Sequence, residues 1–198
     1  MDPFHVYVLH STFSGVQFQK EFALRPTVEW EYMSHGVAYV ASRKLPDDRV
    51  YRRVAQVLMP NVRVVPTPER NSGPGREVAW LVPGDDGSHR SFGVARVGAG
   101  EDPVYERRSR LVQHEGKIWA EMTEEEHQRY PDDFEAQVGQ GSITLHSEEH
   151  LATTDRGIVM MRRLLREQIR AVQAGGDPVG AGPGASELVV TRAGNFFD

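Results

Sequence analysis

The stretch TVEWEYMSHGVAYVASRKL, residues 27–45, indicates how the chain folds. Polar and apolar residues alternate over 27–32, and residues 36–45 are rich in small and β-branched side chains. This pattern is typical of strands with one buried face. The residues between them, Ser34, His35 and Gly36, favour a tight turn. We therefore predict two neighbouring antiparallel strands.

Segments of the same kind continue along the chain, separated by turn residues. The further strands we expect are residues 49–59, 61–66, 77–82 and 88–97. Short strands that follow one another at this spacing are typical of an antiparallel sheet.

The pattern then becomes helical. Thr123 is a suitable N-cap for a short helix, a second short helix is expected over 132–141, and a long helix over 154–174. The long segment carries an apolar stripe at spacings of three and four, formed by Ile158, Met161, Leu165, Ile169 and Val172. We expect this stripe to pack on the sheet. Its arginines, at positions 162, 163, 166 and 170, are expected to be solvated or paired rather than to form a binding patch.

The predicted architecture is an α+β domain over residues 1–176, with an antiparallel sheet covered by a long C-terminal helix. An apolar cavity between such layers is a common place for a small-molecule site. Residues 177–198 form a Gly- and Pro-rich tail with one possible edge strand at 187–192.

Composition excludes several classes of protein. The 198 residues carry a net charge of −5, which argues against a broad nucleic-acid surface. No apolar run reaches the roughly 18 residues of a membrane span, and the start shows no signal-peptide pattern. The absence of cysteine excludes thiolate zinc sites and cysteine-held iron–sulfur clusters within this chain. We expect a cytoplasmic protein whose metal, if any, is held by His, carboxylate or backbone oxygen.

The first ten residues, MDPFHVYVLH, bring two histidines, His5 and His10, and one acid, Asp2, close together in the sequence, and a carboxylate elsewhere in the chain would have to complete a metal site. Two imidazoles and one carboxylate, with open positions left over, are the ligand set of non-haem Fe(II) oxygenases. On an ideal helix, however, two side chains five residues apart point roughly 140° away from each other. His5 and His10 could meet at one ion only where a helix bulges or ends. A half-buried helix with two hydrogen-bonded histidines is the alternative interpretation. The other histidines, at 35, 89, 127, 146 and 150, are expected at the surface or in caps.

Two separated blocks carry a family resemblance. The first is the Asp-x2-His-x4-His pattern of residues 2–10, and the second begins DFEAQVGQGSI at Asp133 and continues to Leu165. Both resemble the catalytic domain of Rieske non-haem iron aromatic-ring-hydroxylating oxygenase alpha subunits, in the phthalate dioxygenase-like branch. Residues 60–66, PNVRVVP, are similar to that branch as well. The resemblance extends to about Gly176 and implies a helix-grip (START/Bet v 1-like) fold.

The resemblance also implies a mononuclear Fe(II) site. His5, His10 and Asp133 match its ligands, and Asp132 is the alternative carboxylate because the two acids are adjacent. Asp2 matches a bridging residue that hydrogen-bonds an iron-ligating histidine and links it to the Rieske cluster of a neighbouring subunit. A carboxylate in such a position orients the imidazole that it contacts.

The activity implied is hydroxylation of an aromatic ring, or oxidative O-demethylation, with O2. Electrons would come from a Rieske [2Fe–2S] centre, reduced by an NAD(P)H-dependent reductase, and the chains would form a homotrimer. A small aromatic substrate is expected, and neither nucleic acid nor a membrane is expected as a partner.

The sequence departs from the family in two ways. It has no cysteine for a Rieske cluster, and it begins at the iron motif itself, so we expect an N-terminally truncated catalytic domain that relies on a Rieske protein in another chain. Two alternatives stay open: a non-enzymatic helix-grip module that binds a small molecule, and an inactive remnant that folds poorly. The aromatic and apolar residues Trp30, Phe92, Val94 and Trp119 could line a pocket or simply fill the core.

Overall fold

The computed structural model describes residues 2–12, 20–66, 73–75, 77–100, 115–181 and 189–198. The strands are β1 (Thr27–Met33), β2 (Gly36–Lys44), β3 (Val50–Leu58), β4 (Val62–Val64), β5 (Gly73–Pro74), β6 (Glu77–Asp85), β7 (Ser88–Ala95) and β8 (Gly194–Phe197). The α-helices are α1 (His5–Val8), α4 (Glu124–Arg129), α5 (Asp133–Val138) and α6 (Arg156–Gln173). Short 3-10 turns lie at Leu9–Thr12, Trp119–Glu121, His146–Glu148 and Thr153–Asp155.

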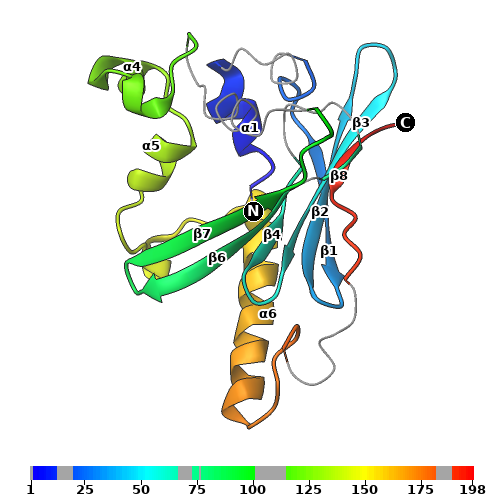
Figure 1. Ribbon diagram of the computed structural model, residues 1–198, viewed down its shortest axis with the longest axis vertical. Helices are drawn as coiled ribbons and strands as arrows, with labels where there is room; N and C mark the ends of the chain where they lie inside the picture. Colours follow the sequence, from blue (N-terminus) through cyan, green and yellow to red (C-terminus); the bar gives the residue numbers. More distant parts are fainter. Residues whose placement is uncertain (1, 13–19, 67–72, 76, 101–114, 182–188) are drawn as a thin grey trace.

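The strands form one antiparallel sheet (Figure 1). Its main order is β1-β2-β3-β4-β6-β7, while β8 pairs with both β3 and β5. The β2–β3 pairing runs without interruption from Gly36↔Leu58 to Lys44↔Val50. The α+β class, the antiparallel sheet and the six internal strands are therefore confirmed, with small shifts at their ends.

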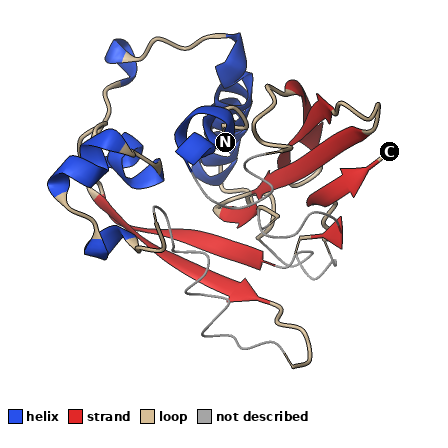
Figure 2. Ribbon diagram, turned by 90° about the horizontal axis from the view of Figure 1, so that it is seen from above, coloured by secondary structure: helices blue, strands red, loops and turns tan. Residues whose placement is uncertain are grey.

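Helix α6 packs against β2 and β1. Gly157 makes this contact possible, because a β-carbon placed there would lie 2.0 Å from Trp30 Cζ3. The Trp30 ring in turn meets the Tyr39 ring edge-on at 5.4 Å. Helices gather on one side of the sheet when the molecule is seen from above (Figure 2).

The long C-terminal helix is confirmed, whereas the helix-grip type of this arrangement stays a prediction. The expected packing of its apolar stripe on the sheet is wrong for Leu165, Ile169 and Val172, which are exposed. The buried residues of α6 are Gly157 and Met160, near its start, so only the first part of the helix is covered by the sheet.

Two buried arginines belong to the core beside β3. The guanidinium carbons of Arg43 and Arg53 each lie 5.2 Å from the centre of the Phe22 ring. Arg43 donates from Nε to the carbonyl of Leu24 at 2.9 Å, and Arg53 donates from Nη1 to Asn195 Oδ1 at 3.1 Å. Burial lowers the pKa of Arg43 to about 10, so the side chain stays charged at neutral pH. Hydrogen bonds and ring contacts thus offset part of the cost of burying these charges, whereas Nη1 and Nη2 of Arg43 are buried without a hydrogen-bond partner within the described residues.

The predicted edge strand at 187–192 is wrong in position. Residues 187 and 188 lie outside the described residues, residues 189–192 are not in a strand, and β8 occupies Gly194–Phe197 instead. The cause is the buried side chain of Gln56, whose Oε1 accepts from the backbone N–H groups of Arg192 at 2.7 Å and Ala193 at 3.0 Å. These hydrogen bonds hold residues 192 and 193 beside β3, just before the point where β8 begins to pair with β3. Within the described residues, no helix has both the length and the hydrophobicity to span a bilayer.

Candidate metal centre

The two N-terminal histidines meet because helix α1 ends between them. His5 opens α1, and His10 lies in the 3-10 turn Leu9–Thr12 that follows. A 3-10 turn winds more tightly than an α-helix and so changes the angle between side chains. The two imidazole rings lie 5.1 Å apart at an interplanar angle of 66°. We expected the two histidines to meet only where a helix bulges or ends. Because α1 ends between them, this condition is met.

Asp133 approaches both histidines from the first residue of α5. Its Oδ1 lies 3.1 Å from His10 Nε2 and 3.6 Å from His5 Nε2. The three donor atoms all lie within 4.8 Å of one another. Neighbouring ligands of an octahedral ion, each about 2.1 Å from the metal, are about 3 Å apart. The donor set therefore fits one metal ion, and two imidazoles with one carboxylate suit a transition metal.

The three side chains differ in exposure. His10 is 11% exposed and His5 is 32% exposed, whereas the Asp133 side chain is 48% exposed. The cluster is thus buried on the side of His10 and open to solvent on the side of Asp133. Such a one-sided arrangement leaves space for further ligands. Among the residues that the structure describes, these three form the one group of at least three His, Asp or Glu side chains close enough to share an ion.

The adjacent acids, Asp132 and Asp133, have different surroundings. Asp132 is buried and is the N-cap of α5, where its Oδ1 accepts from the backbone N–H of Phe134 at 2.7 Å. Burial raises the pKa of Asp132 above its ordinary value. For Asp133, burial acts in the same direction, but the hydrogen bond from His10 and the charges of both histidines and Arg63 outweigh it and lower the pKa. Asp133 is therefore the member of the pair that faces the imidazoles and whose pKa they lower.

Asp2 contacts His5 through its main chain. His5 Nδ1 forms a hydrogen bond with the carbonyl oxygen of Asp2, while Asp2 Oδ1 accepts from the backbone N–H of Phe4 at 2.8 Å. If Nδ1 carries the proton for this bond, the lone pair of Nε2 is directed at the shared centre. The contact that orients His5 thus comes from the carbonyl, and the predicted bridging role of the Asp2 carboxylate stays a prediction.

Sequence reasoning missed the residues that surround Asp133 on the helical side. Glu135 accepts from the backbone N–H of Asp132 at 2.9 Å, and its other oxygen lies between Trp119 and His127. His127 was expected at the surface or in a cap, but its side chain is only 13% exposed and is paired with Glu135. The Asp-x-x-Glu spacing of 132–135 is a capping-box signal that could have indicated Glu135. No local signal indicates Trp119 or His127.

The remaining histidines lie away from the cluster. His35 is in the turn between β1 and β2, where its Nδ1 lies 2.8 Å from Ser34 Oγ. The residues His89, His146 and His150 are exposed.

Comparison with known proteins gives two relatives. The chain is 46% identical over its full 198 residues to the phenoxybenzoate dioxygenase subunit alpha of Ectopseudomonas oleovorans and covers 47% of that protein. It is 32% identical over 210 residues to the tert-butanol monooxygenase / tert-amyl alcohol desaturase oxygenase subunit of Aquincola tertiaricarbonis, which is 94% of this chain and 44% of that protein. The chain is similar to oxygenase subunits. No protein-family model matches it.

Both relatives are named as subunits of oxygenases. The chain spans a little under half the length of either one. Its two matched proteins are named as a dioxygenase subunit and a monooxygenase subunit, so the likeness does not favour one outcome over the other.

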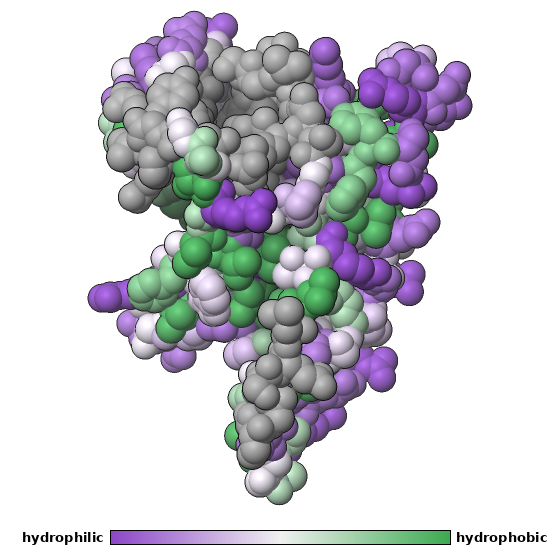
Figure 3. Space-filling model, turned by 45° about the vertical axis from the view of Figure 1, so that its right-hand side comes forward, coloured by the Kyte–Doolittle hydropathy of each residue, from purple (hydrophilic) through white to green (hydrophobic). Residues whose placement is uncertain are grey.

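An open, largely polar groove of about 1010 Å³ adjoins the N-terminal motif at Phe4, but none of the residues His5, His10 and Asp133 lines it. Phe4, the residue before His5, is on its wall, together with Trp30 and Arg156. Trp30 therefore lines this groove and also packs against Tyr39. The three other pocket candidates lie elsewhere: Trp119 stacks on Phe134, and Phe92 and Val94 are exposed on β7. Apolar side chains gather in the middle of the face shown in Figure 3.

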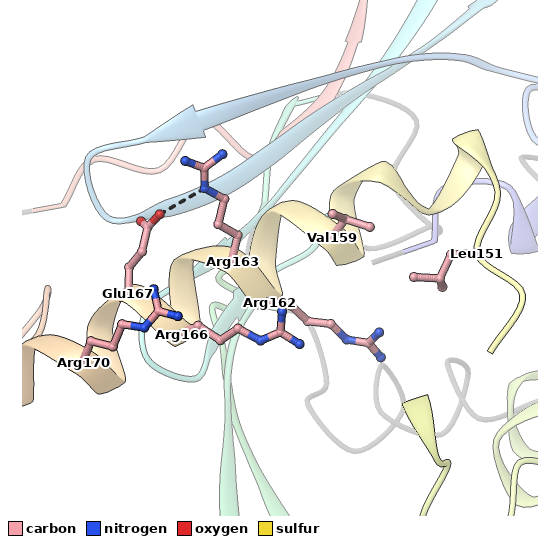
Figure 4. Close-up of a pocket in the computed structure, with 7 residues that line it drawn as sticks. All are labelled: Leu151, Val159, Arg162, Arg163, Arg166, Glu167 and Arg170. Carbon is pink, nitrogen blue, oxygen red and sulfur yellow. Dashed lines mark hydrogen bonds and ion pairs between the residues drawn. The ribbon is translucent and has the colours of Figure 1, made fainter. Parts of the chain in front are cut away.

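A cavity of about 490 Å³ lies along α6 (Figure 4). Four arginines line it, of which two are paired: Arg162 with Glu149 at 2.6 Å and Arg163 with Glu167 at 3.0 Å. The expectation of paired arginines is thus confirmed for these two. The other two are Arg166 and Arg170, and within the described part of the chain neither lies in an ion pair. Arg162, Arg166 and Arg170 extend in the same direction along the helix.

We expect an Arg166→Glu variant to be more stable than the wild type by about 1 kcal/mol. Arg166 is four residues from both Arg162 and Arg170, and like charges at this spacing destabilise a helix by about 0.2–0.5 kcal/mol per pair. Glutamate would replace two repulsive pairs by two attractive ones. Urea denaturation measures the difference. Arg166→Gln, which only removes the repulsion, should give about half the effect, and equal stability of all three proteins would contradict the prediction.

Proposed function

We propose that the chain is the catalytic part of a mononuclear non-haem Fe(II) oxygenase of the Rieske type, with a helix-grip fold. The observation that carries the proposal is the convergence of His5, His10 and Asp133, whose donor atoms come from segments 123 residues apart in the sequence. A carboxylate and two imidazoles on one side of an ion are the ligand set of this class of enzyme.

Each residue of the site would have its own role. His5 and His10 would bind through Nε2, and Asp133 would add one negative charge on the exposed side. The main-chain carbonyl of Asp2 would hold the His5 ring in position. When bound, Fe(II) would supply the activation of O2 next to the substrate. The Asp2 carboxylate would serve as the bridge toward an electron donor on a neighbouring chain.

The substrate we propose is a small aromatic compound, which would be hydroxylated or O-demethylated. The name of one relative, phenoxybenzoate dioxygenase, supports an aromatic substrate, and the volume beside Phe4 is large enough for such a molecule. The 198 residues contain no cysteine, so the Rieske [2Fe–2S] centre that we propose as the electron donor would be held by residues other than these and would be reduced by an NAD(P)H-dependent reductase. A trimer of catalytic chains in the cytoplasm completes the proposal.

The test is the metal content of the protein after anaerobic reconstitution with Fe(II). About one iron per chain is expected for the wild type, because two imidazoles and a carboxylate provide three ligands. Asp133→Ala should retain little iron. Asp132→Asn is the matched control, since asparagine is as good an N-cap as aspartate and Asp132 does not face the histidines.

Each outcome is informative. Iron lost in Asp133→Ala but kept in Asp132→Asn supports the proposed ligand set. Iron kept in Asp133→Ala but lost in Asp132→Asn would make Asp132 the ligand. No iron in the wild type would refute the oxygenase proposal and favour a module that binds a small molecule without metal.

A further inference from the structure

The carboxylate of Glu135 joins three parts of the molecule next to the proposed metal centre. Its Oε2 accepts from the backbone N–H of Asp132 at 2.9 Å. Its Oε1 accepts from Trp119 Nε1 at 2.9 Å and lies 2.7 Å from His127 Nδ1, a contact that can act as an ion pair when His127 is protonated but does not have the geometry of a hydrogen bond. Glu135 therefore connects the first turn of α5 to the turn Trp119–Glu121 and to helix α4.

These contacts act directly on the backbone that carries Asp133. The N–H before Asp133, that of Asp132, is bound by Glu135, and the N–H after it, that of Phe134, is bound by Asp132. Helix α5 has only six residues. A helix of this length is not stable alone in water, so contacts with its surroundings determine where it lies.

The aromatic side chains around Glu135 limit its freedom. The Trp119 ring lies 4.0 Å from the Phe134 ring and 4.8 Å from the His127 ring, measured between centres. The side chains of His127 and Glu135 are 13% and 22% exposed. Trp119 and Phe134 are themselves 37% and 42% exposed, so the hydrogen bond from Trp119 is only partly shielded from solvent, whereas the one from the Asp132 backbone is part-buried. Glu135 is thus held at both of its oxygens, by the Asp132 backbone on one side and by Trp119 on the other.

We propose that Glu135 is a positioning residue that fixes the Asp133 carboxylate against His5 and His10, with Trp119 and His127 holding Glu135 in place. The inference rests on the proposed function, because it concerns the metal affinity of the same site. Outer partners of a metal ligand commonly change the affinity by about 10- to 100-fold. A glutamate that only stabilised a short helix would not have this effect.

Helix α4 provides a matched control within the same chain. Glu126 occupies in α4 the position that Glu135 occupies in α5: its Oε2 accepts from the backbone N–H of the N-cap Thr123 at 2.8 Å, and its other oxygen pairs with Lys117. Within the described residues, α4 contributes no group to the metal cluster, although its His127 lies next to Glu135. Glu126→Gln therefore removes the same kind of charged cap without touching the backbone around Asp133.

The experiment is an anaerobic titration of each full-length protein with Co(II), followed by its visible absorption, with the thermal midpoint of each apo-protein measured in parallel. We expect Glu135→Gln to raise the Co(II) dissociation constant at least about tenfold and to alter the absorption spectrum. Glu126→Gln should lower the thermal midpoint by a similar amount but leave both properties of the Co(II) complex unchanged. Trp119→Phe keeps an aromatic ring but removes the N–H donor to Glu135. It should also raise the Co(II) dissociation constant, by less than Glu135→Gln does.

Two results would overturn the inference. One is a Co(II) affinity and spectrum in Glu135→Gln that equal those of the wild type. The other is an equal loss of affinity in Glu126→Gln, which would assign the effect to general stability. If the wild type itself does not bind Co(II), the proposed function fails together with the inference. If the wild type binds Co(II) and Glu135→Gln binds it equally well, the inference is refuted but the proposed function is not.

Discussion

A His10→Ala variant should bind Fe(II) or Co(II) more than about 100-fold more weakly than the wild type. Loss even of an outer partner of a ligand costs about 10- to 100-fold in affinity, and His10 would be a ligand itself. It is also the least exposed side chain of the three and is the one closest to the Asp133 carboxylate, at 3.1 Å. Metal analysis after gel filtration, together with a Co(II) titration, measures the effect.

His35→Ala is the control for this experiment. His35 lies in the turn between β1 and β2, beside Ser34, and belongs to no group of metal-ligating side chains among the described residues. Its replacement should leave about one metal ion per chain. A His10→Ala protein that still retained one ion per chain would exclude His10 from the site and would refute the ligand set that we propose.

Gly157→Ala should destabilise the protein by about 2 kcal/mol, within the usual cost of overpacking a core. The new methyl group would lie 2.0 Å from Cζ3 and 2.3 Å from Cη2 of Trp30, so either the indole or the start of α6 would have to move. The intrinsic helix preference of alanine over glycine, about 1 kcal/mol in the opposite direction, is already included in this figure. The free energy of unfolding from urea denaturation is the measurement.

Gly93→Ala in β7 separates this clash from a general effect of replacing glycine. A β-carbon at Gly93 would have its nearest neighbour, Glu77 Oε1, at 3.9 Å, which is an ordinary contact. We expect its stability to stay within about 0.5 kcal/mol of the wild type, as for most exposed positions. If the two variants were equally stable, α6 would be able to shift on the sheet at little cost, and its tight contact with Trp30 would not matter for stability.

The sheet could be predicted because its signals are local. Alternating side chains and turn residues define β1, β2 and β3 within short windows of sequence, and the apolar stripe at spacings of three and four defines α6 in the same way. The C-terminal strand could not be placed by such signals. Its position depends on the buried amide of Gln56, which binds the backbone just before β8 and lies 136 residues away in the chain.

The metal site was predictable only in part, and for a similar reason. The spacing of His5 and His10 suggested ligands, but whether they meet depends on where α1 gives way to a 3-10 turn. The choice between the adjacent acids depends on which of them caps α5, and this role belongs to Asp132. The contacts of Glu135 with Trp119 and His127 arise only when three separate segments pack together, so no sequence window contains them.

The position of β8 also affects the order in which the protein can fold. Strands β1, β2 and β3 are consecutive hairpin partners, so they can pair while the ribosome is still making the rest of the chain. Residues 51–54 of β3, however, pair with Gly194–Phe197, which are synthesised much later than β3. Pairings between such distant segments close slowly because the intervening loop has to be ordered first. During that interval β3 presents unpaired backbone groups, so newly made chains are most exposed to mispairing at this edge and would gain most from a chaperone there.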